Sequence, residues 1–191
     1  MKRLPNYLTY LRIVLIPVFV VIFYLPVPWS NLAVTIIFAL AAWTDWLDGF
    51  LARKLGVITA FGAFLDPVAD KLMVAVALVL LVDHNPTTYA GIFMALPAAV
   101  IIGREIVISA LREWMAELGE RAKVAVSVIG KIKTASQMLA LVLLLYRNPI
   151  GGFPTSDTGF VFLYIAAILT LWSMFIYLRA SWPAMQRNGA K

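Results

Sequence analysis

Four aspartates stand close together between two strongly apolar runs, in the stretch DWLDGFLARKLGVITAFGAFLDPVAD at residues 45–70. They are Asp45, Asp48, Asp66 and Asp70, four of the ten acidic residues in a chain that is 62% hydrophobic. On a helix, spacings of three and four residues place each of the two pairs on one face. Carboxylates held this close repel one another unless a cation lies between them. The spacing therefore predicts a site for a divalent cation.

The chemistry of the donors limits which cation this site would hold. Mg²⁺ prefers a few carboxylate oxygens together with water and substrate phosphate. The chain has no cysteine and a single histidine, His84, so a zinc site with the usual nitrogen and sulfur ligands is not expected. We predict one or two ions of Mg²⁺ or Mn²⁺. A helix cap or a solvated charge explains a single aspartate well, but it explains four matched aspartates in apolar segments poorly.

The elements that must position these aspartates are apolar segments long enough to cross a membrane. Mean hydropathy is +0.89, and a membrane-spanning helix needs about 20 residues. We predict an all-α, polytopic membrane protein with six transmembrane helices, forming a single domain over residues 1–191. The six segments cover roughly residues 8–25, 31–53, 67–82, 89–117, 124–146 and 158–180, and Pro67 is expected to open the third, with Asp66 before it or capping it.

The distribution of lysine and arginine predicts the orientation of these helices. Of the connections at 26–30, 83–88 and 147–157, only the last contains a lysine or arginine, Arg147. Because basic residues collect on the cytoplasmic side of membrane proteins, both termini and the stretch 45–70 are predicted at the cytoplasmic face. The net charge of +6 has the same explanation, so we do not expect a nucleic acid as partner.

The aspartates and their neighbours resemble the signature of the CDP-alcohol phosphatidyltransferases. That signature has two aspartates, a glycine and an Ala-Arg pair, followed after eight residues by a glycine and two further aspartates. All eight positions match in this chain, at Asp45, Asp48, Gly49, Ala52, Arg53, Gly62, Asp66 and Asp70. The resemblance implies a six-helix membrane enzyme in which an alcohol displaces CMP from a CDP-linked lipid, with the active site at the cytoplasmic face.

The resemblance also implies a role for each matching residue. The four aspartates would bind the metal, and Asp70 would in addition be the general base that takes the proton of the acceptor hydroxyl. Arg53 would bind diphosphate oxygens, and Gly49 would let the nucleotide approach the helix closely. Residues 5–12, PNYLTYLR, resemble a further pattern of the family. The residues implied to contact CDP-diacylglycerol are Asn6, Thr9, Gly49, Arg53 and Thr59.

Four basic residues near the predicted cytoplasmic ends of two segments indicate the acceptor. Arg104 and Arg112 share one helix face, and Lys131 and Lys133 interrupt an apolar run. Four such cations suit the phosphate of a phosphorylated acceptor, whereas contact with anionic lipids is the alternative. Glu105 is expected to pair with a neighbouring base. The pattern resembles the bacterial branch of the family that uses sn-glycerol 3-phosphate and makes phosphatidylglycerophosphate.

Two other functions remain compatible with the sequence. One is the same reaction with another acceptor, such as inositol phosphate or serine. The other is divalent-cation transport through intramembrane carboxylates, although a conduit would place polar residues through the whole membrane thickness rather than at one predicted face. The resemblance further implies a homodimer embedded among the lipids of a bacterial cytoplasmic (inner) membrane.

Overall fold

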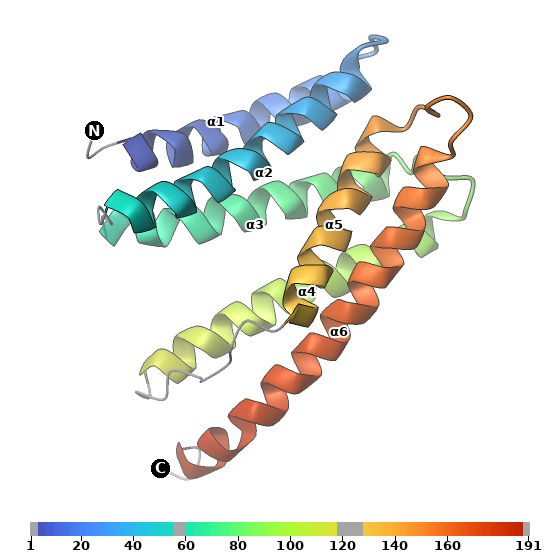
Figure 1. Ribbon diagram of the computed structural model, residues 1–191. Coiled ribbons are helices and arrows are strands. Elements are labelled where there is room, and N and C mark those ends of the chain that lie inside the picture. Colours follow the sequence, from blue (N-terminus) through green and yellow to red (C-terminus); the bar gives the residue numbers. More distant parts are fainter. Residues whose placement is uncertain (1–3, 56–59, 118–127, 189–191) are drawn as a thin grey trace. The chain divides into compact units, whose positions relative to one another are not determined.

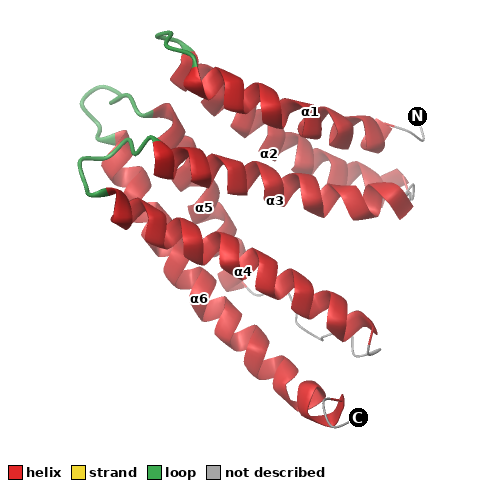
Figure 2. Cartoon of the chain, turned by 180° about the vertical axis from the view of Figure 1, so that it is seen from behind, coloured by secondary structure: helices red, strands yellow, loops and turns green. Residues whose placement is uncertain are grey.

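The computed structural model is all-helical over the residues that it describes, 4–55, 60–117 and 128–188 (Figure 1). The connections that the structure describes are short loops, drawn green in Figure 2, and the extended pairing within the described ranges is an isolated bridge between Ile150 and Phe153. The predicted all-α class is confirmed, and each predicted apolar segment corresponds to a helix. The helices are α1 (Leu4–Tyr24), α2 (Ser30–Leu55), α3 (Ala60–Asp83), α4 (Gly91–Glu117), α5 (Val128–Tyr146) and α6 (Thr155–Asn188).

Helix α3 begins earlier than the sequence predicted. We expected Pro67 to open this helix, but α3 already starts at Ala60. Pro67 therefore lies inside the helix, where it cannot donate the backbone hydrogen bond of its turn. Prolines are tolerated in apolar helices of this kind, and α1, α4 and α6 each also contain one beyond the first turn, at Pro17, Pro97 and Pro183. The correction matters for the site, because Asp66 is not a helix cap and instead shares one continuous helix with Asp70.

The chain divides into two compact units. The first comprises residues 1–88 and 141–156, and the second comprises residues 89–140 and 157–191. In the first unit, α1 packs against both α2 and α3, and α2 also packs against α3. The rings of Phe19 and Phe38, 6.4 Å apart, join α1 to α2 in a fully buried core that also contains Leu78 and Leu81 of α3. Burial of such side chains is the main stabilising contribution to a helical core.

A cluster of polar and aromatic side chains lies at the C-terminal end of α3, the end far from Asp66. The Tyr24 hydroxyl donates a 2.8 Å hydrogen bond to Asp83 Oδ2, and His84 Nδ1 lies 2.7 Å from the same oxygen. The pKa of the Asp83 carboxyl lies below its usual value, chiefly because of the hydrogen bond from Tyr24 and next because of the hydrogen bond with His84. Arg147 lies 4.7 Å from the centroid of the Phe23 ring and donates to the His84 carbonyl oxygen. The cluster thus ties the ends of α1 and α3 to the residue that follows α5.

The second unit contains α4, α6 and most of α5. Helix α4 buries one face along its whole length, at Met94, Ile101, Ile108 and Met115, because positions seven residues apart return to the same side of a helix. Arg104, one turn from Ile101, lies on this buried face. The charge of Arg104 therefore lies inside the unit rather than on its surface.

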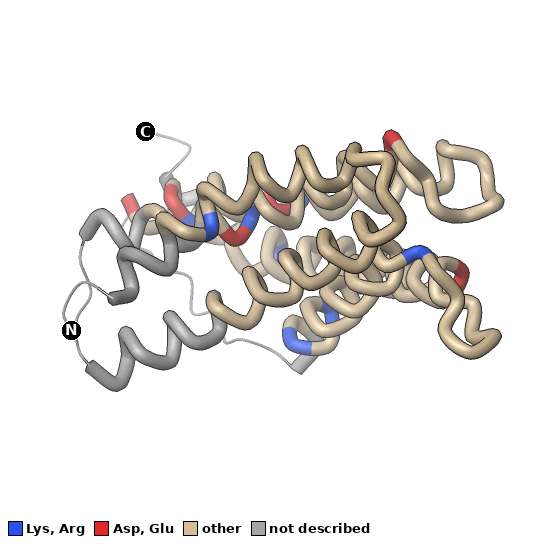
Figure 3. Tube along the Cα trace, turned by 90° about the horizontal axis from the view of Figure 1, so that it is seen from above, with Lys and Arg blue, Asp and Glu red and all other residues tan. Residues whose placement is uncertain are grey.

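Large apolar side chains remain exposed on the outer faces of the helices. On α6 they form a stripe with helical spacing, at Val161, Ile165, Ile168, Trp172 and Phe175. Long stretches of the helices carry no charged residue (Figure 3). Among the described residues, the helical segments Gly91–Glu117 and Thr155–Pro183 are long and apolar enough to cross a membrane, and Tyr10–Tyr24 and Ser30–Thr44 are shorter apolar stretches.

Candidate functional site

The predicted metal ligands lie on two neighbouring helices of the first unit. Asp45 and Asp48 belong to the last turns of α2, and Asp66 and Asp70 belong to the first part of α3. The end of α2, the start of α3 and the start of α1 all lie at the same end of this unit (Figure 1). The fold therefore brings the two aspartate pairs and the start of α1, which carries Asn6, to one end of a packed three-helix group.

Side-chain positions are described for only part of this set. Asp70 is half-buried. Thr59 lies outside the described residues. Several other predicted residues have a helical backbone, and the structure describes nothing of them beyond that backbone. They are Asn6, Thr9, Asp45, Asp48, Gly49, Arg53 and Asp66.

The donor set fits a hard divalent cation. Both aspartate pairs lie on regular helix, so that spacings of three and four residues put the members of each pair on one face. Carboxylate oxygens are the preferred ligands of Mg²⁺ and Mn²⁺. Within the described side chains, which include only one of the four aspartates, no group of three or more acidic or histidine residues could hold a metal ion. The metal site therefore stays a prediction that the backbone accommodates.

A buried ion cluster joins α4 to α5 in the second unit. Glu105 Oε1 accepts hydrogen bonds of 2.9 Å from both Arg104 Nη1 and Lys133 Nζ. The side chains of Arg104 and Lys133 are only 9% and 8% exposed, and that of Glu105 is 25% exposed. Ser173 on α6 accepts a longer bond of 3.4 Å from Arg104 Nη2. The expected pairing of Glu105 with a base is confirmed, and one carboxylate faces two cations.

Arg112 lies outside this ion cluster, in contact with Tyr177 of α6. Its Nη2 donates to the Tyr177 hydroxyl oxygen at 3.1 Å, and its guanidinium carbon lies 5.3 Å from the ring centroid. The Arg104 guanidinium carbon lies 5.7 Å from the same centroid. Both distances suit cation–π attraction. Unlike Arg104, Arg112 is exposed, so its remaining N–H groups are accessible from outside the unit.

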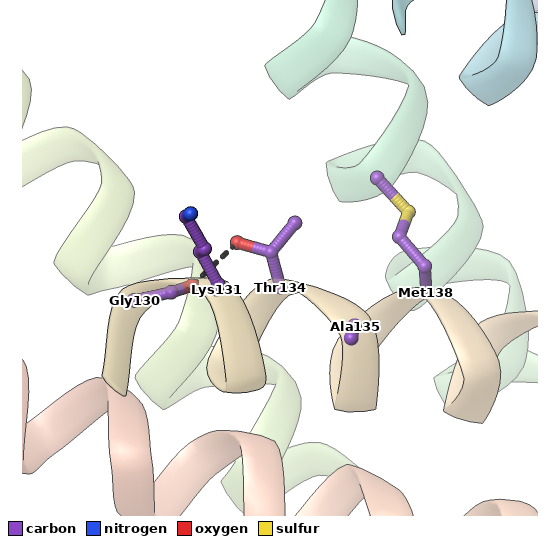
Figure 4. Close-up of a pocket in the computed structure, with 5 residues that line it drawn as sticks. All are labelled: Gly130, Lys131, Thr134, Ala135 and Met138. Carbon is purple, nitrogen blue, oxygen red and sulfur yellow. Dashed lines mark hydrogen bonds between the residues drawn. The ribbon is translucent and has the colours of Figure 1, made fainter. Parts of the chain in front are cut away.

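Lys131 occupies a different face of α5 from Lys133, because residues two apart point in different directions on a helix. It is exposed and lines an open, largely apolar pocket of about 450 Å³. Lys131, Thr134 and Met138 extend from the same side of α5 in Figure 4, where the Thr134 hydroxyl donates to the Gly130 carbonyl oxygen at 3.0 Å. The four predicted acceptor cations are thus brought together only in part.

The two α6 residues that contact the arginines were not predicted from the sequence. Ser173 and Tyr177 are four residues apart, so they share one face of the helix. A signal was available, because polar side chains at helical spacing within an apolar segment are costly unless they face polar partners. Their partners could not be read from the sequence, because they lie about 70 residues away on α4.

The chain is similar in sequence to one protein family and to several named proteins. The family model described as CDP-alcohol phosphatidyltransferase matches residues 2–172. A protein of Pseudomonas fluorescens named CDP-diacylglycerol–glycerol-3-phosphate 3-phosphatidyltransferase is 58% identical over 99% of this chain and 95% of its own length. Proteins with the same name from Yersinia pestis and from Escherichia coli K12 are 57% and 56% identical, each over 94% of this chain and over 95% and 94% of their own lengths.

Proposed function

Because this chain belongs to the CDP-alcohol phosphatidyltransferase family, we propose that it transfers the phosphatidyl group of CDP-diacylglycerol to sn-glycerol 3-phosphate. The products are phosphatidylglycerophosphate and CMP. The observation that carries this proposal is the identity of 56% to 58%, over nearly the full length, to relatives that are named for this reaction. The basic side chains of the second unit agree with it, since a phosphorylated acceptor needs cationic partners.

The proposed reaction forms one P–O bond and breaks another. A hydroxyl oxygen of the acceptor attacks the lipid-linked phosphorus of CDP-diacylglycerol, the bond from that phosphorus to the bridging oxygen breaks, and CMP leaves with the electron pair. Asp70 takes the hydroxyl proton, which requires it to come within hydrogen-bond reach of the acceptor. Arg53 binds diphosphate oxygens through its planar guanidinium. Asn6, Thr9, Gly49 and Thr59 contact the nucleotide.

The aspartates on α2 and α3 are the residues that would hold a divalent ion. Asp45, Asp48, Asp66 and Asp70 supply carboxylate oxygens, and one or two ions of Mg²⁺ or Mn²⁺ are expected. A bound ion of this kind neutralises charge on the diphosphate and on the leaving group. The support for the set is its spacing on two helices that pack against each other.

We further propose that the whole chain is one multi-pass domain of a bacterial cytoplasmic membrane. Exposed apolar stripes such as that on α6 suit contact with lipid, and six helices with the observed distribution of basic residues suit six spans with both termini in the cytoplasm. That the protein works as a homodimer among membrane lipids rests on family resemblance alone.

Metal removal provides a direct test of the proposed reaction. We expect purified protein in vesicles containing CDP-diacylglycerol to release CMP only when glycerol 3-phosphate and a divalent cation are both present. Excess chelator should stop release, and added Mg²⁺ or Mn²⁺ should restore it, because the carboxylates alone cannot neutralise the diphosphate. CMP release that continues at full rate in chelator would contradict the metal assignment, and release that does not depend on the acceptor would contradict the transfer reaction.

A further inference from the structure

Tyr177 on α6 lies against two arginines that come from different turns of α4. Arg104 and Arg112 are eight residues apart, which corresponds to about 12 Å along a helix. The Tyr177 ring nevertheless has both guanidinium carbons near its centroid, at 5.7 and 5.3 Å. One aromatic side chain therefore contacts both arginines that were predicted to bind the acceptor phosphate.

The two arginines differ in what their donors already contact. Arg104 is buried, and its guanidinium donates to Glu105 and Ser173. The Glu105 carboxylate also accepts a hydrogen bond from Lys133, so Arg104 and Lys133 share one negative charge inside the unit. Arg112 is exposed, and it donates to the uncharged Tyr177 hydroxyl. An anion that arrives from water therefore contacts Arg112 before Arg104. Arg112 offers it a full positive charge and several N–H groups.

The hydrogen bond between Arg112 and Tyr177 also determines what the hydroxyl can do. The Tyr177 oxygen accepts the Arg112 N–H at 3.1 Å, so its own hydrogen is directed elsewhere. Within the described ranges of the chain, no acceptor for that hydrogen is found. A tyrosine O–H beside a guanidinium offers two adjacent donors, a combination that suits phosphate oxygens.

We propose that the Tyr177 hydroxyl and Arg112 together bind the phosphate of the acceptor, whereas the buried Arg104 and Lys133 share the Glu105 carboxylate. The proposal rests on the proposed function for the identity of the acceptor. It adds Tyr177, a residue of α6, to the acceptor site, and it separates the four predicted cations by role. Lys131, on another face of α5, is not part of this phosphate subsite.

The test removes a single oxygen atom. We expect Tyr177→Phe to raise the KM for glycerol 3-phosphate about tenfold, because a hydrogen bond to a charged group is lost. The kcat and the KM for CDP-diacylglycerol should stay within about twofold. The matched control is Tyr164→Phe, which removes a hydroxyl from the same helix, where it donates to the Phe93 carbonyl oxygen at 2.9 Å. That control should leave all three constants unchanged.

Equilibrium binding makes the outcome independent of turnover. Titration calorimetry with glycerol 3-phosphate should give about tenfold weaker binding for Tyr177→Phe, and the double variant Tyr177→Phe/Arg112→Gln should bind no more weakly than Arg112→Gln alone, since one subsite is lost in either case. Unchanged binding by Tyr177→Phe, or equal weakening by Tyr164→Phe, would overturn the proposal. Wild-type protein that binds glycerol 3-phosphate but forms no phosphatidylglycerophosphate would instead contradict the proposed function.

Discussion

Replacing Asp70 with asparagine is expected to lower the rate of phosphatidylglycerophosphate formation by at least about 100-fold. General acid–base catalysis contributes roughly 10² to 10⁴ to a rate, and an amide cannot accept the proton of the acceptor hydroxyl. Asp70 is half-buried on α3, near the end of the first unit at which α2 ends and α3 begins. We expect the affinity for CDP-diacylglycerol to change little, because asparagine keeps the size of the side chain and one oxygen. Product formation from labelled CDP-diacylglycerol in vesicles measures the rate.

A matched control for this variant is Asp83→Asn. Asp83 lies on the same helix at the opposite end, where its carboxylate is exposed and hydrogen-bonded to Tyr24. The same chemical change at this position should leave the reaction rate within about twofold. Full activity of Asp70→Asn would eliminate Asp70 as the base. A similar loss in both variants would mean that the carboxylates act through the stability of α3 instead.

The variant Glu105→Ala is expected to destabilise the protein by about 3 kcal/mol, because removing one partner of a buried ion cluster leaves the others uncompensated. Here two cations lose their common acceptor, and the side chains of both Arg104 and Lys133 are less than 10% exposed. Thermal unfolding in detergent micelles should show a midpoint that is lower by several degrees. Glu113→Ala, on the exposed part of the same helix, should change stability by no more than about 0.5 kcal/mol.

A double variant distinguishes charge from packing. If the loss in Glu105→Ala comes from unpaired buried charge, Glu105→Ala/Lys133→Met should be more stable than the sum of the two single effects predicts, because one of the stranded cations is gone. Strictly additive effects would mean that the ion cluster contributes through packing alone. A Glu105→Ala protein as stable as the wild type would contradict the cluster itself.

The helices were predictable from the sequence because their signals are local. Long apolar runs, prolines and charged interruptions marked all six segments. The start of α3 was predicted wrongly for the same reason, since Pro67 carries a local preference for the first helical turn. Packing against α1 and α2 supports a helix that runs through this proline from Ala60, and such tertiary contacts override local preference.

The candidate site was predictable only where its residues are close in sequence. The aspartate spacing within α2 and within α3 could be read directly, and so could the presence of cations on α4 and α5. Their partners could not, because the contacts of Arg104 with Ser173 and of Lys133 with Glu105 join different helices. The four cations could not be told apart from the sequence, whereas in the structure Arg104 is buried and Arg112 is exposed. Fractional burial depends on which helix faces meet, and one segment's periodicity does not determine that.

The acceptor alcohol is the central claim, and identification of the lipid product tests it most directly. Purified protein in vesicles with radiolabelled CDP-diacylglycerol would be given glycerol 3-phosphate, inositol phosphate, serine or no alcohol, each with and without chelator, and the lipids separated by thin-layer chromatography. We predict one labelled product, phosphatidylglycerophosphate, formed only with glycerol 3-phosphate and divalent cation. A labelled product that forms instead with inositol phosphate or serine, or none with any acceptor, would contradict the account.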